Sequence, residues 1–326
     1  MNDIDTKPIL LGVSDAEHSE GALLFAVEEA LRHPCGITVM HVLPGSMPPP
    51  PDSPIGFGSH AERTHHFVDR SRSQEADDLV NEIARRARAL VKGKVEIETS
   101  TPIGRRVHTI VDAAENARLV VLEHRDLPVL ERMFVRSTSV GVSARAHCPV
   151  VTVPPHWKSQ VHHNRITVAV DVIDDAAGVL RVAFESAMQR SARINVVHAW
   201  KFMGSETDAI APQELVDEWQ QRSAEQLKNA LEPWRQEFPD VEVDSQFVRM
   251  RAVEALLECS QDSDLLVLGR SQPSLPLPLP LGSVARAMVN GAHCPVEVVP
   301  HGAGTPAASP FGPDHQPNTS QAASQG

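Results

Sequence analysis

Cysteine is scarce in this chain. Among its 326 residues only four are cysteines, and they stand far apart in the sequence: Cys35, Cys148, Cys259 and Cys294. Proteins that depend on disulfides for their stability carry many closely spaced cysteines. The spacing therefore argues against a disulfide framework, and we expect a reducing, cytoplasmic compartment.

The chain also lacks an excess of basic residues and lacks any long apolar run. Its formal net charge of −12 argues against binding to nucleic acid or to an anionic membrane surface, since both favour a basic face. No apolar run approaches the roughly 18 residues of a membrane span. Residues 1–7 are polar and acidic, so we expect neither a signal peptide nor a transmembrane helix.

Residues for nucleophilic or metal chemistry do not form recognisable patterns. The sequence has no Ser–His–Asp arrangement, no paired catalytic carboxylates and no P-loop lysine motif. The pairs His147-Cys148 and His293-Cys294 contain metal-ligating residue types, but each pair stands alone and lacks the spacing of a zinc site. We interpret both pairs as core residues that precede a strand, and we expect no metal.

What the sequence does contain is an internal repeat. Ala146-His-Cys-Pro-Val150 returns as Ala292-His-Cys-Pro-Val296, at an offset of 146 residues. Nearer the front, Ile9-Leu-Leu-Gly-Val13 matches Ile166-Thr-Val-Ala-Val170 at an offset of 157, so the first repeat carries 11 extra residues. The proline-rich segment 44–60 is the obvious insertion, and the fixed φ of proline favours a loop there.

Each repeat holds five short apolar runs, separated by helical patterns. The runs lie near 8–13, 37–42, 94–99, 118–122 and 149–153, and again near 165–170, 193–198, 241–247, 264–268 and 295–299. Several are apolar at consecutive positions, which favours parallel strands covered on both faces. Helices are predicted over 19–31 with Ser19 as N-cap, 73–91, 214–238 with a break or kink at Pro233, and 252–260. Alternating strands and helices predict doubly wound α/β sheets.

These units suggest where the domains begin and end. We expect a first domain over 1–154, a linker over 155–164, a second domain over 165–300 and a tail over 301–326. The tail has too little apolar bulk to offset its ordering entropy, so we expect it to be disordered. The last strands of the two domains should pair about a pseudo-two-fold axis, because an unpaired apolar edge favours aggregation.

A ligand of such a sheet would bind beyond the carboxyl ends of the strands, where the strand order reverses. We expect this point between the first and fourth strands of each repeat. In the second repeat Asp171 follows strand one and Leu268-Gly269 ends strand four, while Gly282-Ser283-Val284 opens a helix that Ser283 can cap. Free amides at that helix would favour an anion, and Asp171 could accept a hydrogen bond from a ribose hydroxyl. The same residues also suit an ordinary loop-to-helix junction and a turn, so by themselves they leave both interpretations open.

The full layout resembles the universal stress protein family, in a tandem UspA-like form. The resemblance rests on Val-His-Ala at 197–199, the segment Arg251-Ala-Val-Glu-Ala-Leu-Leu257, the strand-four run 265–268 and the two Ala-His-Cys-Pro-Val segments. It implies two tandem Rossmann-like domains of the adenine nucleotide alpha hydrolase-like type. Each would be a five-stranded parallel sheet flanked by helices and paired through its last strand. One branch of the family binds ATP with the pattern Gly-x2-Gly-x9-Gly-Ser.

In the second repeat most of this pattern is present. Its glycine positions fall on Gly269, Gln272 and Gly282, so one glycine is replaced, and Ser283 follows as expected. The loop 273–280 is proline-rich and uncharged where the family usually has glycine and arginine. The nucleotide-contacting set that the resemblance implies is Asp171, Ala199, Leu268, Gly269, Gln272, Gly282, Ser283 and Val284.

The first repeat departs further from the pattern. Its glycine positions fall on Glu123, Asp126 and Arg136, its aspartate position on Ser14, and only Ser137 remains of the Gly-Ser pair. A carboxylate in contact with a phosphate costs roughly 1 to 4 kcal/mol. We therefore interpret the first repeat as a degenerate copy that does not bind ATP.

Three functions remain open at this point. The leading one is a stress-response protein that binds ATP or another adenine nucleotide in its second domain as a regulatory ligand. The alternative is a nucleotide-free interaction protein in which both sites are degenerate. The third is a slow ATPase, for which Asp171 is the one evident base or metal ligand.

Overall fold

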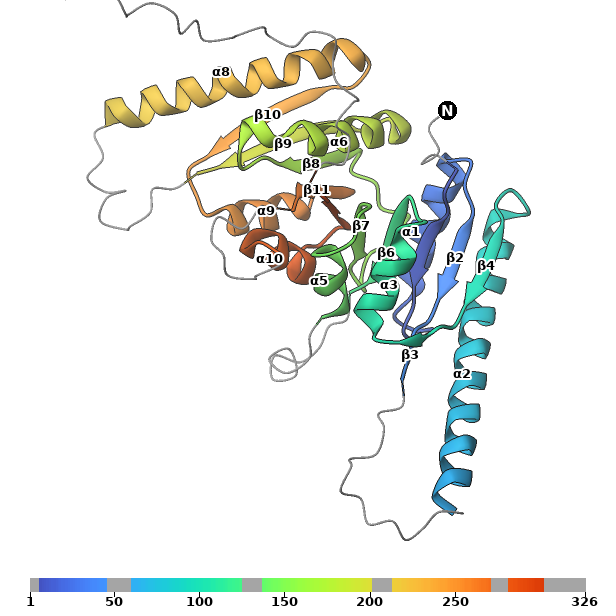
Figure 1. Ribbon diagram of the computed structural model, residues 1–326. Helices are drawn as coiled ribbons and strands as arrows, with labels where there is room; N and C mark the ends of the chain where they lie inside the picture. Colours follow the sequence, from blue (N-terminus) through green and yellow to red (C-terminus); the bar gives the residue numbers. More distant parts are fainter. Residues whose placement is uncertain (1–5, 46–59, 125–136, 201–212, 271–280, 302–326) are drawn as a thin grey trace, which may run out of the picture.

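The computed structural model describes residues 6–45, 60–124, 137–200, 213–270 and 281–301 (Figure 1). Several sequence predictions fall on other residues. Gln272, Asp126 and Arg136 lie outside the described residues, as do the loop 273–280, most of the proline-rich insertion and nearly all of the tail.

Ten strands form one sheet, in the order β10-β9-β8-β11-β12-β7-β6-β1-β2-β4. Every neighbouring pair is parallel except β12 and β7, which pair antiparallel. The strands of the first repeat are β1 (Ile9–Gly12), β2 (Ile37–Met40), β4 (Ile97–Ser100), β6 (Leu119–Glu123) and β7 (Val150–Val153). Those of the second repeat are β8 (Arg165–Ala169), β9 (Arg193–Ala199), β10 (Val243–Val248), β11 (Leu265–Gly269) and β12 (Val296–Val299).

Helices cover both faces of this sheet (Figure 1). One face carries α1 (Glu20–Arg32), α2 (His60–Val91), α6 (Ala177–Arg190) and α8 (Gln213–Glu237). The other face carries α3 (Arg106–Ala114), α5 (Thr138–Ser143), α9 (Ala252–Ser260) and α10 (Ser283–Gly291). A short 3-10 helix, η1 (Ile173–Asp175), follows β8.

The apolar strand runs follow from this two-sided cover. All four residues of β1 are buried: Ile9 and Leu11 join the core under α1, whereas Leu10 joins the core under α3. Successive side chains of a strand point to opposite faces, so a strand covered on both sides is apolar throughout. The core under α1 and α6 contains residues of both repeats, so the repeats share it.

The strand order reverses where the sequence analysis placed the reversal. In each repeat the first strand lies between the second and the fourth, as β9-β8-β11 and β2-β1-β6 show. The crevice beyond the carboxyl ends of such a pair is the usual ligand position of an open α/β sheet. The two candidate positions thus lie beyond β8 and β11 and beyond β1 and β6.

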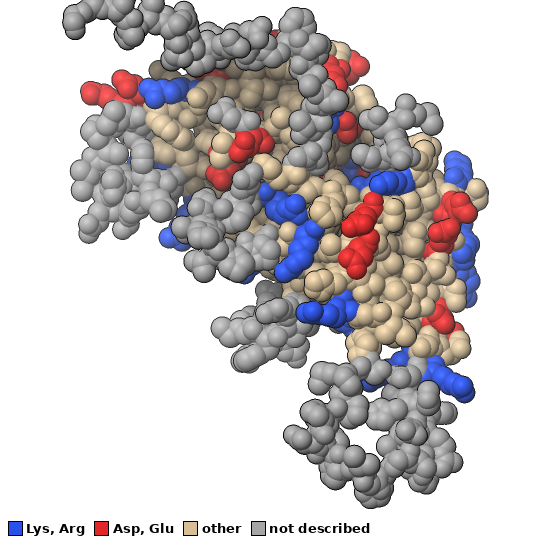
Figure 2. All heavy atoms as spheres, in the orientation of Figure 1, with Lys and Arg blue, Asp and Glu red and all other residues tan. Residues whose placement is uncertain are grey.

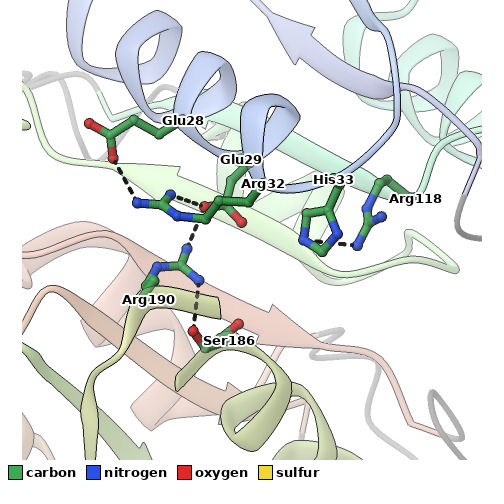
Figure 3. Close-up of polar contacts among 7 residues, drawn as sticks. All are labelled: Glu28, Glu29, Arg32, His33, Arg118, Ser186 and Arg190. Carbon is green, nitrogen blue, oxygen red and sulfur yellow. Dashed lines mark hydrogen bonds and ion pairs between the residues drawn. The ribbon is translucent and has the colours of Figure 1, made fainter. Parts of the chain in front are cut away.

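The last strands, β7 and β12, join the two repeats. Glu297 lies opposite Val151, with Val296 opposite Thr152 and Val298 opposite Val150. On the α1 side of this pair, the carboxylate of Glu29 accepts a hydrogen bond from Arg190, with 2.6 Å between Nη2 and Oε1 (Figure 3). The expected pairing of the last strands is thus present, and an ion pair accompanies it.

Several elements differ from the sequence prediction. A second sheet of two strands, β3 (Leu43–Pro44) and β5 (Ile103–Gly104), was not predicted, because two-residue strands carry no periodicity. The helix predicted over 73–91 begins at His60 instead. Pro233 lies inside α8 and does not end the helix, which continues to Glu237.

The charged side chains are mixed on the described surface. Figure 2 shows acidic and basic residues interspersed over the face that carries α3, α5 and α10. Within the part of the chain that the structure describes, no helix combines the length and the apolar character needed to cross a membrane.

Candidate functional site

The sheet register brings the predicted residues of the second repeat to one edge. Leu268 of β11 lies beside Ala169 of β8, which lies beside Val197 of β9. All three strands are parallel, so the residues that follow each of these positions leave the sheet at the same edge. Gly269, Asp171 and Ala199 therefore meet at the carboxyl edge of the second repeat.

Asp171 has an exposed side chain just beyond β8. The backbone before it is fixed, because the Val170 amide donates to the Val197 carbonyl at 3.1 Å. The buried His198 also fixes the backbone of Val170, because its Nδ1 lies 2.9 Å from the Val170 carbonyl oxygen. A carbonyl oxygen only accepts hydrogen bonds, so Nδ1 carries the proton. Asp171 is thus an accessible hydrogen-bond acceptor on a rigid support.

The helix α10 begins at the same edge. Because β12 runs parallel to β11, the connection between them must return along the sheet, and α10 therefore starts near the carboxyl ends of the strands. Gly282 is its N-cap and provides no side-chain hydrogen bond, while Ser283 is exposed as the first helical residue. The expectation that Ser283 caps the helix was therefore wrong. The first amides of α10 keep their capacity to bind an anion.

Gly269 ends β11 in close contact with α6. A Cβ atom at this position would lie 3.0 Å from Cγ2 of Val179, which is at the limit of what packed side chains tolerate. A larger residue at 269 would therefore require the Val179 side chain to shift by a few tenths of an ångström. The glycine fits this close packing, and it leaves the end of β11 without a side chain.

The first repeat fills the equivalent place with a carboxylate. Glu123 ends β6 and is buried, and its carboxylate accepts a hydrogen bond from the hydroxyl of Ser19. Its backbone carbonyl accepts a second one from Ser139 Oγ at 3.2 Å. Ser19 stands at the N-cap of α1, as predicted, but its side chain makes no capping hydrogen bond. The hydroxyl serves Glu123 instead.

The helix at the edge of the first repeat is also closed. Ser137 is the N-cap of α5, and its Oγ accepts the amide of Val140 at 3.4 Å. Ser14 takes the place of Asp171 and is half-buried. The two edges therefore differ in three respects. The second repeat has an exposed carboxylate after its first strand, whereas the first repeat has a side chain at the end of its fourth strand and a capped helix.

The remaining predicted residues are placed as follows. Ala199 and Val284 are half-buried and pack against the core under α9 and α10, and Leu268 belongs to that core. Gln272 lies outside the described residues. Of the two histidine–cysteine pairs, Cys148 and Cys294 lie in the core, whereas His147 and His293 are exposed, so the expectation of core placement was wrong for the histidines. Burial raises the pKa of the Cys148 thiol to about 11. Among the described residues no group of three or more His, Cys, Asp or Glu side chains is placed to hold a metal ion.

Two features near this edge were missed by the sequence analysis. Arg270, directly after Gly269, donates from Nη1 to the carbonyl of Ala146 in the first repeat at 3.0 Å, and burial lowers the pKa of its guanidinium. Trp200, directly after Ala199, has its ring centroid 4.7 Å from that of Trp219 in α8, with Arg249 above its ring. Both could have been noticed in the sequence, because each directly follows a predicted ligand position.

Both the fold and the edge define a class: a tandem α/β protein whose two doubly wound halves join through their last strands into one ten-stranded sheet. Comparison with known proteins is more specific. The chain matches the universal stress protein family over residues 5–154 and 162–300. It therefore belongs to the universal stress protein family.

Relatives of similar length support this membership. A universal stress protein of Mycolicibacterium smegmatis is 27% identical over 297 residues, which cover 89% of this chain and 96% of the relative. Universal stress protein Rv2005c of Mycobacterium tuberculosis is 28% identical over 297 residues, again covering 89% and 96%. A universal stress protein structure from Archaeoglobus fulgidus covers 91% of this chain and 97% of its own, with a TM-score of 0.65 and 17% identity.

Proposed function

We propose that the second repeat binds an adenine nucleotide such as ATP as a regulatory ligand, and that the first repeat does not. The observation that carries this proposal is the contrast between the ends of the two fourth strands. At the end of β6 the buried Glu123 is held by Ser19, whereas β11 ends in Gly269. A nucleotide phosphate would meet a negative charge in the first repeat and none from this position in the second.

Each described residue of the second repeat then has a chemical role. Asp171 accepts hydrogen bonds from the ribose hydroxyls, since its side chain is exposed beyond β8. The amides at the start of α10 bind phosphate, assisted by the positive end of the helix dipole. Gly282 allows the phosphate to approach the backbone closely. Ala199 would line the base.

The test is calorimetric titration of the full chain with ATP, beside the variant Ser283→Asp. This change puts a carboxylate in the first turn of α10, which stabilises the helix through its dipole but repels a phosphate. We expect micromolar binding in the wild type and at least about a tenfold loss in the variant, equal to roughly 1.4 kcal/mol. The thermal midpoint should not fall.

The matched control is Ser137→Asp, the same change at the equivalent position of the first repeat. Aspartate is a good N-cap, so α5 should remain folded, and ATP binding should stay at the wild-type value. Asp171→Asn should weaken binding without changing stability. If the wild type does not bind at millimolar nucleotide, the second candidate applies: an interaction protein that binds no nucleotide. Both repeats would then lack a nucleotide site, as the closed edge of the first repeat already indicates for that repeat.

A further inference from the structure

The contact between the two repeats is symmetric in its backbone. Residues of the two last strands correspond at the offset of 146, so Val151 and Glu297 are equivalent positions. The structure pairs these two residues with each other, and it pairs Val296 with Thr152 and Val298 with Val150 on either side. Exchanging the two repeats therefore reproduces the same register, and the pseudo-two-fold axis passes through Val151 and Glu297.

The charges around this axis are not symmetric. Glu29 and Arg190 form an ion pair at 2.6 Å, with side chains that are only 7% and 10% exposed (Figure 3). At the offset of 157 the equivalent of Glu29 is Ser186, and the equivalent of Arg190 is His33. The reciprocal contact would thus join a serine to a histidine. The ion pair forms only when a first repeat meets a second repeat.

Glu297 lies on the axis itself and is buried in the contact. It faces the apolar Val151, and burial raises the pKa of its carboxyl to about 7. The charged groups around it are Arg190 and Glu185 from α6, Glu29 from α1 and Arg118 from the turn before β6. The strands on either side, β7 and β11, present no titratable side chain to it.

We propose that the last strand of the second repeat, with Glu297 and Arg190, is a recognition surface that fits a first repeat and rejects a second copy of itself. A pair of second repeats in the same register would place Glu297 directly opposite another Glu297. Two ionised carboxylates directly opposite in an antiparallel pair repel each other, and they avoid this repulsion only by retaining a proton as a second buried polar group in an apolar contact. Each Arg190 would face Ser186 instead of Glu29, so the buried ion pair would be lost.

Two other contacts across the axis do not discriminate between a first and a second repeat. Arg270 donates to the backbone carbonyl of Ala146, and the equivalent residue in a second repeat, Ala292, offers the same acceptor. The valines at the two ends of the register also fit either partner. Glu297 and the pair Glu29–Arg190 are the charged part of this selectivity, because a buried ion pair that loses one partner is strongly destabilising. Two apolar contacts add to it: Arg190 lies 5.9 Å from the ring centroid of Phe25, and Ala144 is buried in the core under α10. A second repeat has Val182 and Asn290 at these two positions.

The proposal can be tested on the folded protein after cleavage between the repeats. A protease site is introduced into the exposed linker at 160–163, and the folded chain is cut there. Isotope-labelled and unlabelled cut proteins are mixed, and native mass spectrometry counts the pairs after exchange. We expect pairs of one first and one second repeat, with pairs of two second repeats at least about 100-fold rarer. Statistical proportions of the three pairings would overturn the proposal.

A variant that allows two second repeats to pair tests whether Arg190 and Glu297 cause the selectivity. In the cut protein carrying Ser186→Glu with Glu297→Val, each Arg190 of a second repeat would find a carboxylate on the other copy. No carboxyl would remain on the axis. We expect pairs of second repeats to appear. The matched control Ser186→Gln with Glu297→Val should not form them, and failure of the Glu variant to self-pair would also overturn the proposal.

The intact chain provides a measurement that does not depend on cleavage. Urea unfolding of Glu29→Gln, Arg190→Gln and the double variant gives the coupling between the two positions. We expect the double variant to be at least about tenfold more stable, in unfolding equilibrium constant, than additive effects would give. Additive effects would show that the ion pair does not hold the two repeats together.

Discussion

Single residues at the ends of the fourth strands separate the two repeats. Glu123, Ser19 and the small Ala22 occupy positions that Gly269, Ala176 and Val179 occupy in the second repeat. In one repeat a carboxyl is held by a hydroxyl, and in the other a valine packs against a glycine. The substitutions compensate each other in volume and in polarity. Reversing one of them alone would therefore leave either an unpartnered polar group or a clash.

The first residue-scale prediction concerns the pH dependence that Glu297 brings. Its pKa is raised from 4.5 to about 7 by burial, so the folded chain retains a proton that the unfolded chain releases. The stabilisation is complete below pH 4.5 and is lost as the pH rises through about 7. We expect the wild type to lose about 3 kcal/mol over this window relative to Glu297→Gln, at about 1.4 kcal/mol per unit of pKa shift.

Urea unfolding from pH 4.5 to 8.5 measures this difference. The control is Glu258→Gln, which removes a carboxyl from the exposed face of α9 and should follow the wild type at each pH. A constant difference between the wild type and Glu297→Gln across the pH range would mean that the carboxyl does not titrate in the contact.

The sequence predicts which residues lie at the carboxyl edges of the sheet, but it does not predict which partners their side chains contact. The offsets alone put Glu123 on a glycine position and Asp171 on the aspartate position, and both lie at the expected edge. That Glu123 turns to Ser19 could not be predicted, because the two are 104 residues apart in the chain. Glu297 is recognisable in the sequence as an acid within an apolar run. Its position opposite Val151 of β7 depends on the pairing of the two last strands and could not be predicted.

At the scale of elements, the packing of α5 on α3 depends on one glycine. A Cβ at Gly141 would lie 2.8 Å from Cγ2 of Val107, closer than packed atoms approach. The second repeat has Ala287 and Val253 at these positions, so its two helices accommodate the extra methyl group. The helices of the first repeat are therefore closer at this point than a side chain would permit.

We expect Gly141→Ala to destabilise the protein despite the better helix propensity of alanine. Overpacking costs typically about 1 to 3 kcal/mol, whereas the propensity gain is at most about 1 kcal/mol. Adding Val107→Ala removes the clash and should recover part of the loss. Thermal unfolding of the three variants measures both steps. A stabilised Gly141→Ala protein would show that α5 moves freely away from α3.

Element prediction succeeded where a segment was long or apolar. The ten strands and the helix at 252–260 were predicted because burial on both faces or one apolar stripe marks them in the sequence. The strands β3 and β5 are too short for any period, and the start of α2 follows a proline-rich segment in which no apolar stripe marks the boundary. Pro233 shows that a breaker near a helix end can be tolerated.

At the scale of the whole molecule, the shared core predicts one unfolding transition. Trp157 packs on Phe25 of the first repeat with 5.8 Å between ring centroids, and Trp234 stacks on Phe184 of the second at 6.0 Å. Variants that keep only one of these tryptophans report on each repeat separately. We expect equal midpoints in urea, because the core under α1 and α6 spans both repeats.

Two separated midpoints would contradict this expectation and would show that each repeat unfolds independently. In that case Arg190→Gln should leave both midpoints nearly in place. If the transition is single, the same variant should lower both midpoints together, because the ion pair Glu29–Arg190 connects the repeats.

The antiparallel pairing of β7 and β12 places the ligand edges of the two repeats at opposite ends of the sheet. Strands within a repeat are parallel, so the carboxyl edge of the first repeat and that of the second open toward opposite ends of the sheet. If the second repeat binds a nucleotide as proposed, occupancy changes at the end of the sheet that carries Asp171 and α10, while the end that carries Glu123 stays the same. A partner that contacts both ends would then compare an end whose occupancy varies with an end that does not change.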